Sequence, residues 1–324
     1  MIYEDQGDCD PHYKVRFVYD MNMKFADAFP NEVNEVTLYV IDDATGKIVL
    51  TKHESGEALR QDGYMMDIDV TPGDYHLVAW CGEGHTTSFG VSESEVHTGL
   101  KCSLLDRQEP VEGPWDKSGS HVRNDLKRLY HGRLETQNFP DEEGTYVYTV
   151  PLVKNTNNVH IVLQHLSGEP VDPDDFTFTI SDENGLMDWD NTVLDDENLT
   201  YFAWHTKSGI AGVEVPDYTG DKNRAVVQVS AAVAELTTGR LMADHSRKSY
   251  VNIYNKRHEL VVRIPLIDYL LLVKGEYNRD MSDQEYLDRQ DDYSLVFFLD
   301  DGGRWMDAFI YINSWKVVLQ DVDV

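Results

Sequence analysis

Alternation of apolar and polar residues is the strongest pattern along the chain. It runs through four segments of the first half, at residues 14–19, 36–41, 64–70 and 75–80. Because successive side chains of a strand point to opposite faces, this alternation places one set in a core and the other in water. Turn sequences separate the segments, as in Pro72-Gly73. Short strands at this spacing predict a β-sandwich.

The second half repeats this plan. Residues 159–164 resemble residues 15–20, and residues 176–185 resemble residues 36–46, at offsets of 159 − 15 = 144 and 176 − 36 = 140. Two similar segments in the same order predict two copies of one domain type, and a chance pairing of ordinary strands is the alternative. Further strands are predicted at residues 224–230, 249–254, 259–264, 293–299, 309–312 and 315–320.

The length of 324 residues favours two domains, because one core rarely fills so long a chain. A polar segment at residues 154–158 separates two apolar runs, which predicts a first domain at 1–154 and a second at 155–324. Residues 109–141 are rich in Gly, Pro and charge, which predicts a long loop or a short helix on the first domain.

Two short helices are predicted in the last quarter of the chain. Residues 266–274 follow Pro265, a residue that is common at helix starts. Ser282 and Glu285 form a capping-box pattern, which predicts a second helix that ends near Arg289. The predicted class is therefore all-β, with a few short helices.

The charge of the chain limits its partners. Lys and Arg number 28 against 58 Asp and Glu, so the net charge is 28 − 58 = −30. Such a surface repels nucleic acid and anionic lipid headgroups, so no nucleic-acid partner is expected. No run of eighteen apolar residues is present, so attachment to a membrane would need a covalent anchor.

The three cysteines, Cys9, Cys81 and Cys102, form no CxxC pair. One disulfide among them would fit an oxidising compartment, and three pairings are possible. Three buried free thiols are the alternative, and the sequence does not decide between them.

Motifs for catalysis or for metal and nucleotide binding are absent from the sequence. It holds no HExxH, no GxSxG, no GxxxxGK[ST] and no GxGxxG pattern. The acidic clusters at residues 172–175, 188–190 and 195–197 lack the spacing of an EF-hand, and loop carboxylates exposed to solvent are the simpler interpretation. We therefore predict no enzymatic activity, no metal and no cofactor.

Six tryptophans offer the remaining chemistry. They could build a platform on which sugars stack, although packing in cores or loops is the more common role. They are Trp80, Trp115, Trp189, Trp204, Trp305 and Trp315.

Three parts of the chain together resemble the FimB-type fimbrillin-associated anchor family, found as fimbrial anchor lipoproteins of Gram-negative anaerobes. They are residues 2–22, which include Cys9; residues 72–80, which end at Trp80; and residues 281–317, which include Trp305 and Trp315. The resemblance covers essentially the whole chain. No single motif carries it, but the order of the three parts does.

The resemblance implies two tandem transthyretin-like β-sandwich domains. It also implies a lipoprotein exported with a signal peptide, which attaches adhesive fimbriae to the outer membrane and limits their length. In the family an acylated cysteine precedes a segment like residues 2–5. Here that cysteine would lie upstream of Ile2 and is absent, and we interpret Met1 as a start left by removal of the signal. Cys9 does not fit a lipid site, because no apolar stretch precedes it.

The function expected from this resemblance is that of a fimbrial anchor or assembly subunit, with fimbrillin shaft subunits and, through an N-terminal lipid, the outer membrane as partners. A glycan-binding surface lipoprotein or a fimbrial tip adhesin is the alternative. A hydrolase built on a sandwich scaffold is a third hypothesis, which would need an acid, a base and aromatic residues in one cleft.

The C-terminal segment at residues 312–320 is the predicted contact with the first shaft subunit. Its predicted partner-binding residues are Ile312, Trp315, Val317 and Leu319, the last three of which share one face of the strand. The resemblance implies that relatives polymerise by inserting a strand into a neighbour. The alternative is that this strand only completes the second sandwich.

Overall fold

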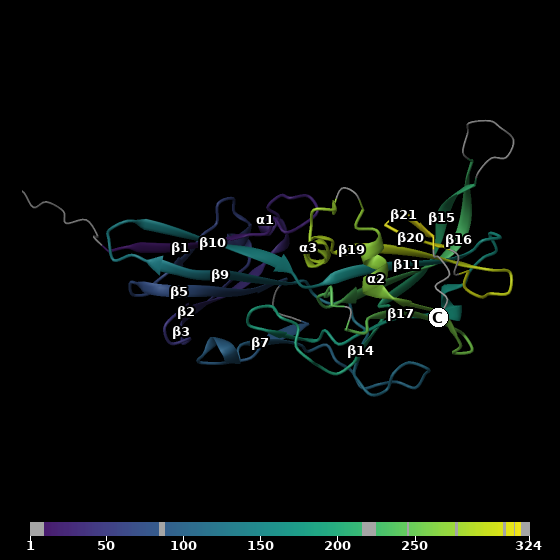
Figure 1. The fold of residues 1–324 in the computed structure, drawn as a ribbon, viewed down its shortest axis with the longest axis horizontal. Helices are drawn as coiled ribbons and strands as arrows, with labels where there is room; N and C mark the ends of the chain where they lie inside the picture. The colour runs from purple at the N-terminus through teal and green to yellow at the C-terminus, as the bar shows by residue number, and fades with distance from the viewer. Residues whose placement is uncertain are drawn as a thin grey trace, which may run out of the picture. The chain divides into compact units, whose positions relative to one another are not determined.

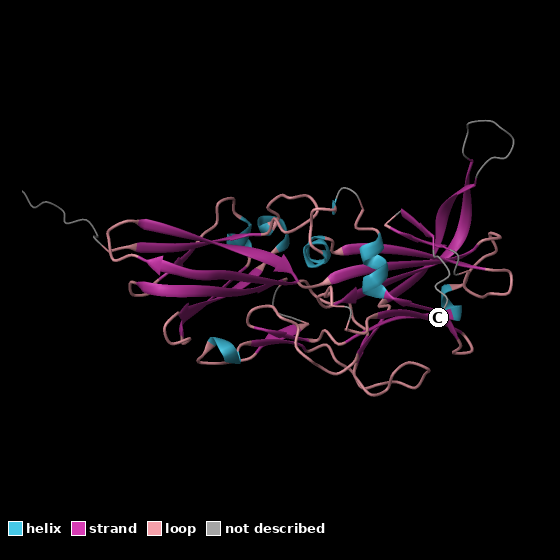
Figure 2. Cartoon of the chain, in the orientation of Figure 1, coloured by secondary structure: helices cyan, strands magenta, loops and turns pink. Residues whose placement is uncertain are grey.

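A computed structural model describes residues 10–83, 88–215, 225–244, 246–275, 278–306, 309–313 and 315–318. Strands form about half of it, and the helices between them are short (Figure 2). The predicted all-β class is confirmed. The chain folds into two compact units. The first unit holds residues 1–105, 127–156 and 185–194, and the second unit holds residues 106–126, 157–184 and 195–324.

The division into units differs from a single cut between residues 154 and 155, which stays a prediction. Residues 106–126 of the first half belong to the second unit, and residues 185–194 of the second half belong to the first unit. Strand pairing holds both segments in place. Within the second unit, β8 (His121–Val122) pairs with β14 (Leu199–Phe202). Within the first unit, β13 (Leu186–Asp188) pairs with β7 (Lys101–Leu104).

The first unit is built on a seven-stranded sheet in the order β3-β2-β5-β9-β10-β1-β4. Its neighbouring strands are antiparallel except β1 and β10, which are parallel. The strands are β1 His12–Val18, β2 Glu35–Asp42, β3 Ile48–Ser55, β4 Met66–Ile68, β5 Gly73–Gly82, β9 Leu129–Phe139 and β10 Thr145–Lys154. Short helices accompany them, namely α1 Phe29–Glu32 and the 3₁₀ turn η1 Glu57–Arg60.

The core of the first unit lies between the two halves of this sheet. Strand β10 joins β9 only through residues 152–154, so the sheet divides there into two parts. Both parts contribute to one buried cluster, for example Phe17 of β1 and Leu38 of β2. Each fully buried side chain of this size stabilises the fold by about 1.5–3 kcal/mol. The alternating pattern of the sequence therefore marks the inner faces of a sandwich.

A three-stranded sheet, in the order β13-β7-β6, completes the first unit. It contains β6 (Phe89–Val91), and the 3₁₀ turn η2 (His97–Gly99) precedes β7.

The second unit contains two sheets (Figure 1). One has the order β15-β16-β11-β19-β20-β21 and the other the order β18-β17-β12-β14-β8, and β12 and β14 contact β16 across the space between them. The parallel neighbours are β11 with β19 and β14 with β8. The further strands are β11 Asn157–His165, β12 Phe176–Asp182, β15 His205–Val215, β16 Ala225–Thr238, β17 Tyr250–Asn255, β18 Leu260–Pro265, β19 Asp292–Leu299, β20 Phe309–Ile312 and β21 Trp315–Val318.

The five-stranded sheet has one apolar and one polar face. On β12, Phe178 and Ile180 are buried in the core, while Thr179 and Ser181 lie on the opposite face. The neighbouring strand β17 follows the same rule, with Ile253 on the core side. The face turned away from the core is consequently lined by hydroxyl and amide groups.

The helices of the second unit confirm both helix predictions. Helix α2 spans Leu266–Leu272 after Pro265, and it ends two residues earlier than predicted. Helix α3 spans Asp283–Arg289, and the Ser282 hydroxyl accepts a hydrogen bond of 3.1 Å from the Glu285 backbone N–H. The 3₁₀ turn η3 spans Pro173–Asp175.

The prediction for residues 109–141 was wrong. This stretch contains β8 and the eleven-residue strand β9, and residues 106–126 belong to the second unit. The first four residues of β9, from Leu129 to Gly132, are all buried. A strand covered on both faces has no polar and apolar alternation, and here His131 and Gly132 also interrupt the apolar run that such a strand usually shows.

Candidate functional site

The predicted partner-binding residues lie in the last two strands described. Ile312, at the end of β20, is fully buried and pairs with Leu295 of β19. Trp315 and Val317 lie in β21, where their register partners are Ile312 and Ile310. The predicted residue Leu319 lies outside the described residues.

Strand β21 forms one edge of the six-stranded sheet. It pairs with β20, and none of the strands described pairs with its other side. Asn313, which follows β20, is held in place: its φ is 48°, and its side-chain Oδ1 accepts a hydrogen bond of 2.8 Å from the Ser294 N–H. An edge held in place with unpaired backbone groups can add a strand from another chain.

The cysteines within the described part do not form a disulfide. Cys81 and Cys102 are both buried free thiols, and Cys9 lies outside the described residues. Cys81 belongs to the hydrophobic core of the sandwich. Cys102 instead lies on β7 of the three-stranded sheet. Burial raises the pKa of both thiols, which keeps them protonated and makes them poor nucleophiles.

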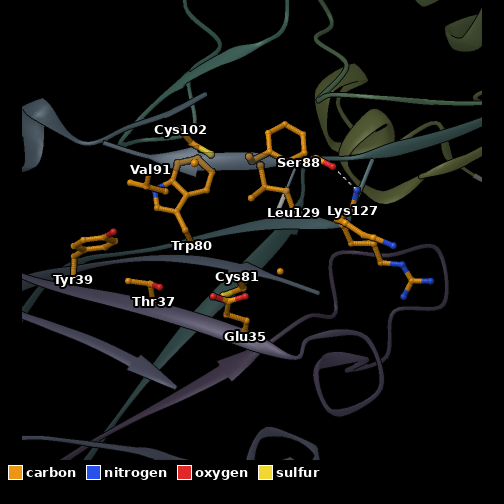
Figure 3. Close-up of a pocket in the computed structure, with 14 residues that line it drawn as sticks. Glu35, Thr37, Tyr39, Trp80, Cys81, Ser88, Val91, Cys102, Lys127 and Leu129 are labelled. Atoms are coloured by element: carbon orange, nitrogen blue, oxygen red, sulfur yellow. Dashed lines mark hydrogen bonds between the residues drawn. The ribbon is translucent and has the colours of Figure 1, made fainter. Parts of the chain in front are cut away.

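A pocket of about 260 Å³ lies in the first unit, between β2 and β5 of the large sheet and β6 and β7 of the small one. Figure 3 shows Trp80 directed toward Cys102, with Glu35 beside Cys81. The Lys127 backbone N–H donates to the Ser88 hydroxyl at 3.0 Å. Glu35 lies 3.6 Å from His53, and this contact of side chains forms an ion pair when the histidine is protonated.

The acidic clusters are occupied by interactions within the protein. Asp196 and Glu197 form ion pairs with Arg107, at 2.5 and 2.7 Å. Asp175 pairs with Lys256 at 2.7 Å, and the Asp188 carboxylate accepts a hydrogen bond from the Trp189 N–H. Across the described ranges, no group of three or more His, Cys, Asp or Glu side chains is placed to hold a metal ion.

The tryptophans pack against separate partners. Ring contacts pair Trp80 with His131, Trp115 with Phe202 and Tyr254, Trp189 with His97, Trp204 with His205, and Trp305 with Phe297. Nothing is described for the side chain of Trp315. Trp80 lines the pocket of the first unit, and Trp115 lines a pocket of the second unit that is rich in hydroxyl and amide groups. No sequence motif marks that pocket, because its residues come from five separate segments.

The helices described include none long and apolar enough to cross a bilayer.

Solved structures resemble this chain over nearly its whole length. A candidate adhesin from Bacteroides thetaiotaomicron is 35% identical with a TM-score of 0.82, and the match covers 98% of this chain and 100% of the adhesin. A candidate polysaccharide-binding protein from the same species is 29% identical with a TM-score of 0.77, over 97% and 99%. No curated protein sequence matches.

The fimbrial anchor protein Mfa2 from Porphyromonas gingivalis shares the fold. The TM-score is 0.66 at 16% identity, and the match covers 96% of this chain and 100% of Mfa2. A family model described as fimbrillin-A associated anchor proteins Mfa1 and Mfa2 matches residues 6–321. This match and the resemblance found in the sequence agree over almost every residue, so the chain belongs to the family of fimbrillin-A associated anchor proteins Mfa1 and Mfa2.

Proposed function

We propose that this protein is a fimbrial anchor, a lipoprotein that attaches adhesive fimbriae to the outer membrane and limits their length. The family match over residues 6–321 carries the proposal. The buried thiols, the occupied acidic clusters and the edge strand β21 support an assembly role rather than catalysis. Fimbrillin shaft subunits are the proposed partners.

The membrane attachment is proposed to be a lipid on a cysteine upstream of Ile2. A net charge of −30 gives the folded part no attraction to an anionic surface. Acyl chains supply the missing affinity, since each buried methylene contributes about 0.8 kcal/mol. Two or more chains on one cysteine would hold the protein at the membrane firmly.

Labelling of the full-length precursor with radioactive palmitate tests this attachment. We expect the label to enter the protein, and replacement of the upstream cysteine by alanine to abolish it and to release fimbriae into the medium. Cys9→Ala serves as the control and should change neither result. Label that persists after loss of the upstream cysteine would refute lipidation at that position.

The shaft contact is proposed to be strand addition at β21. The edge of β21, with which no described strand pairs, and the hydrogen bond that holds Asn313 support it. The burial of Ile312 shows that β20 also contributes to the core, so the donor role is proposed for the segment from Trp315 onward.

The chain is proposed to form two tandem transthyretin-like sandwich domains, with the boundary between its two halves near residues 154 and 155. The positions of β1 and β11 in their own sheets support this repeat. Each is the first strand of its half, and each pairs in parallel with a late strand, β10 or β19. The sequence repeat at residues 15–20 and 159–164 lies in the same two strands.

Glycan binding is the second candidate function. The structure that is 29% identical is described as a candidate polysaccharide-binding protein. In this chain, a pocket lined by Trp115, Tyr254 and several hydroxyl and amide groups favours it.

A further inference from the structure

The polar face of the five-stranded sheet carries a cleft within the second unit. The strand register places Arg263 of β18, Asn252 of β17 and Thr179 of β12 side by side across three strands. Thr200 of β14 follows beside Ser181. We call the hollow over these residues the polar cleft; it is lined by Thr179, Ser181, Thr200, Asn252, Tyr254 and Arg263.

The floor of the polar cleft contains a hydrogen-bonding group without a partner. Asn252 is 5% exposed, and its side-chain oxygen accepts no hydrogen bond from any described residue. A buried amide oxygen left unpaired costs about 1–3 kcal/mol. The side chain lines a hollow of about 260 Å³. A ligand with hydroxyl groups would fill this space and donate the missing hydrogen bond.

The loop that forms one wall is held rigidly. His121 is fully buried; its Nδ1 accepts from the Val111 N–H at 3.2 Å, which leaves Nε2 to donate to the Asp116 carbonyl at 3.1 Å. The Trp115 indole N–H donates to the Val111 carbonyl at 3.0 Å. The Trp115 ring is thereby positioned at the cleft, edge-on to Tyr254 at 5.9 Å between centroids.

The cleft contains one positive charge, that of Arg263, which no described carboxylate pairs with, in spite of the acidity of the whole chain. The Arg263 guanidinium lies 4.3 Å from the centre of the Tyr250 ring, and no described carboxylate forms an ion pair with it. Lys248 lines the adjoining hollow of about 420 Å³, also without a described ion pair. Asp116 also lines the cleft, and its carboxylate accepts a hydrogen bond from Asn198 at 2.8 Å. Glu183 and Glu197 line the adjoining hollow, where Glu197 pairs with Arg107 at 2.7 Å.

We infer that the polar cleft binds an acidic saccharide unit, with its hydroxyl groups against Thr179 and Asn252 and its carboxylate against Arg263. Sugar hydroxyls both donate and accept, as the mixed floor of the cleft requires. The Tyr254 and Trp115 rings supply the apolar wall against which the C–H face of a sugar packs. Guanidinium groups bind carboxylates in a bidentate geometry. The inference rests on glycan binding as the second function and is independent of fimbrial anchoring.

Calorimetric titration of the purified protein with glucuronic and galacturonic acids, and with glucose and galactose as matched neutral sugars, tests the inference. We expect at least one acid to bind about tenfold more tightly than its neutral counterpart. Arg263→Ala should remove this difference in affinity. Asn252→Ala should weaken the binding of the acidic sugar and of its neutral counterpart. Arg257→Ala, on the turn between β17 and β18 and outside the cleft, is the control and should bind like the parent protein.

Melting curves establish that each variant is folded, and fimbrial retention is measured on cells that carry the same variants. Retained fimbriae together with lost sugar binding would support the cleft as a separate site. Failure of all four sugars to bind overturns the inference. Equal affinity for acidic and neutral sugars, or an unchanged affinity in Arg263→Ala, overturns the role of Arg263.

Discussion

Asp182, the last residue of β12, shows how one residue depends on its surroundings. It is 3% exposed, and this burial raises its pKa to about 6, although its carboxylate accepts a hydrogen bond from the Glu183 N–H at 2.7 Å. The folded protein therefore binds more protons than the unfolded chain between pH 3.8 and about 6. The contribution of this carboxyl group to stability is lost as the pH rises through that window.

Asp182→Asn is expected to stabilise the protein at pH 7.5 by up to about 3 kcal/mol, because a neutral amide avoids the burial of a charge. The amide oxygen keeps the hydrogen bond to Glu183. At pH 4 the difference should nearly vanish. Thermal unfolding at both pH values measures it, with the exposed Asp62→Asn as the control. A variant that is destabilised equally at both pH values would contradict the assignment.

At the level of single residues, the sequence predicted which apolar side chains are buried better than it predicted their contacts. Phe17, Leu38 and Ile180 lie inward as their alternation requires. The fate of Cys81 and Cys102 was not decided by sequence, because only the fold separates a core position on β5 from a position on the small sheet.

An ion pair between Asp288 and Arg240 joins helix α3 to the segment that follows β16. Asp288 and Arg240 are both 11% exposed in their side chains, and they form a bidentate pair at 3.0 and 2.7 Å. Removal of one partner leaves a buried charge. We expect Asp288→Ala to lower the free energy of unfolding by about 3–5 kcal/mol.

Urea denaturation measures this loss. Glu285→Ala on the same helix is the control, because its pair with Arg289 is an i,i+4 pair worth about 0.5 kcal/mol. Similar losses of unfolding free energy in the two variants would show that the buried pair stabilises the protein no more than an exposed pair does.

Strand β21 allows a direct test of the donor proposal by deletion of residues 315–324. Ile312 keeps its pairing with Leu295 of β19 in the truncated protein. We therefore expect a cooperative thermal transition to remain while fimbriae are no longer retained on cells. Circular dichroism follows the transition, and loss of cooperativity would show that this strand serves the core instead.

The whole molecule depends on segments that the two units exchange. A fragment of residues 1–154 lacks β13, the partner of β7, and a fragment of residues 155–324 lacks β8, the partner of β14. The fragment of residues 155–324 also lacks Arg107, which pairs with Asp196 and Glu197. We expect both fragments to melt at lower temperature than the intact chain.

Scanning calorimetry of the fragments and of the intact chain checks this expectation. As the control, residues 185–194 are fused to the fragment of residues 1–154. This fusion should recover part of the stability of the first unit, because β7 regains its neighbour β13. Fragments cut at 154 and 155 that reproduce every transition of the intact chain would contradict it.

The sequence by itself determined the class of the fold, the two short helices and the family. Period-two alternation, turn residues and the pattern from Ser282 to Glu285 are local signals, so they are readable without knowledge of distant contacts. The tertiary structure alone decided the strand order, the exchange of residues 106–126 and 185–194, and the polar cleft. Hydrogen bonds between strands join residues far apart in sequence, and backbone groups pair in the same way whatever their side chains. Arg263, Asn252 and Thr179 therefore become neighbours only when β18, β17 and β12 pair.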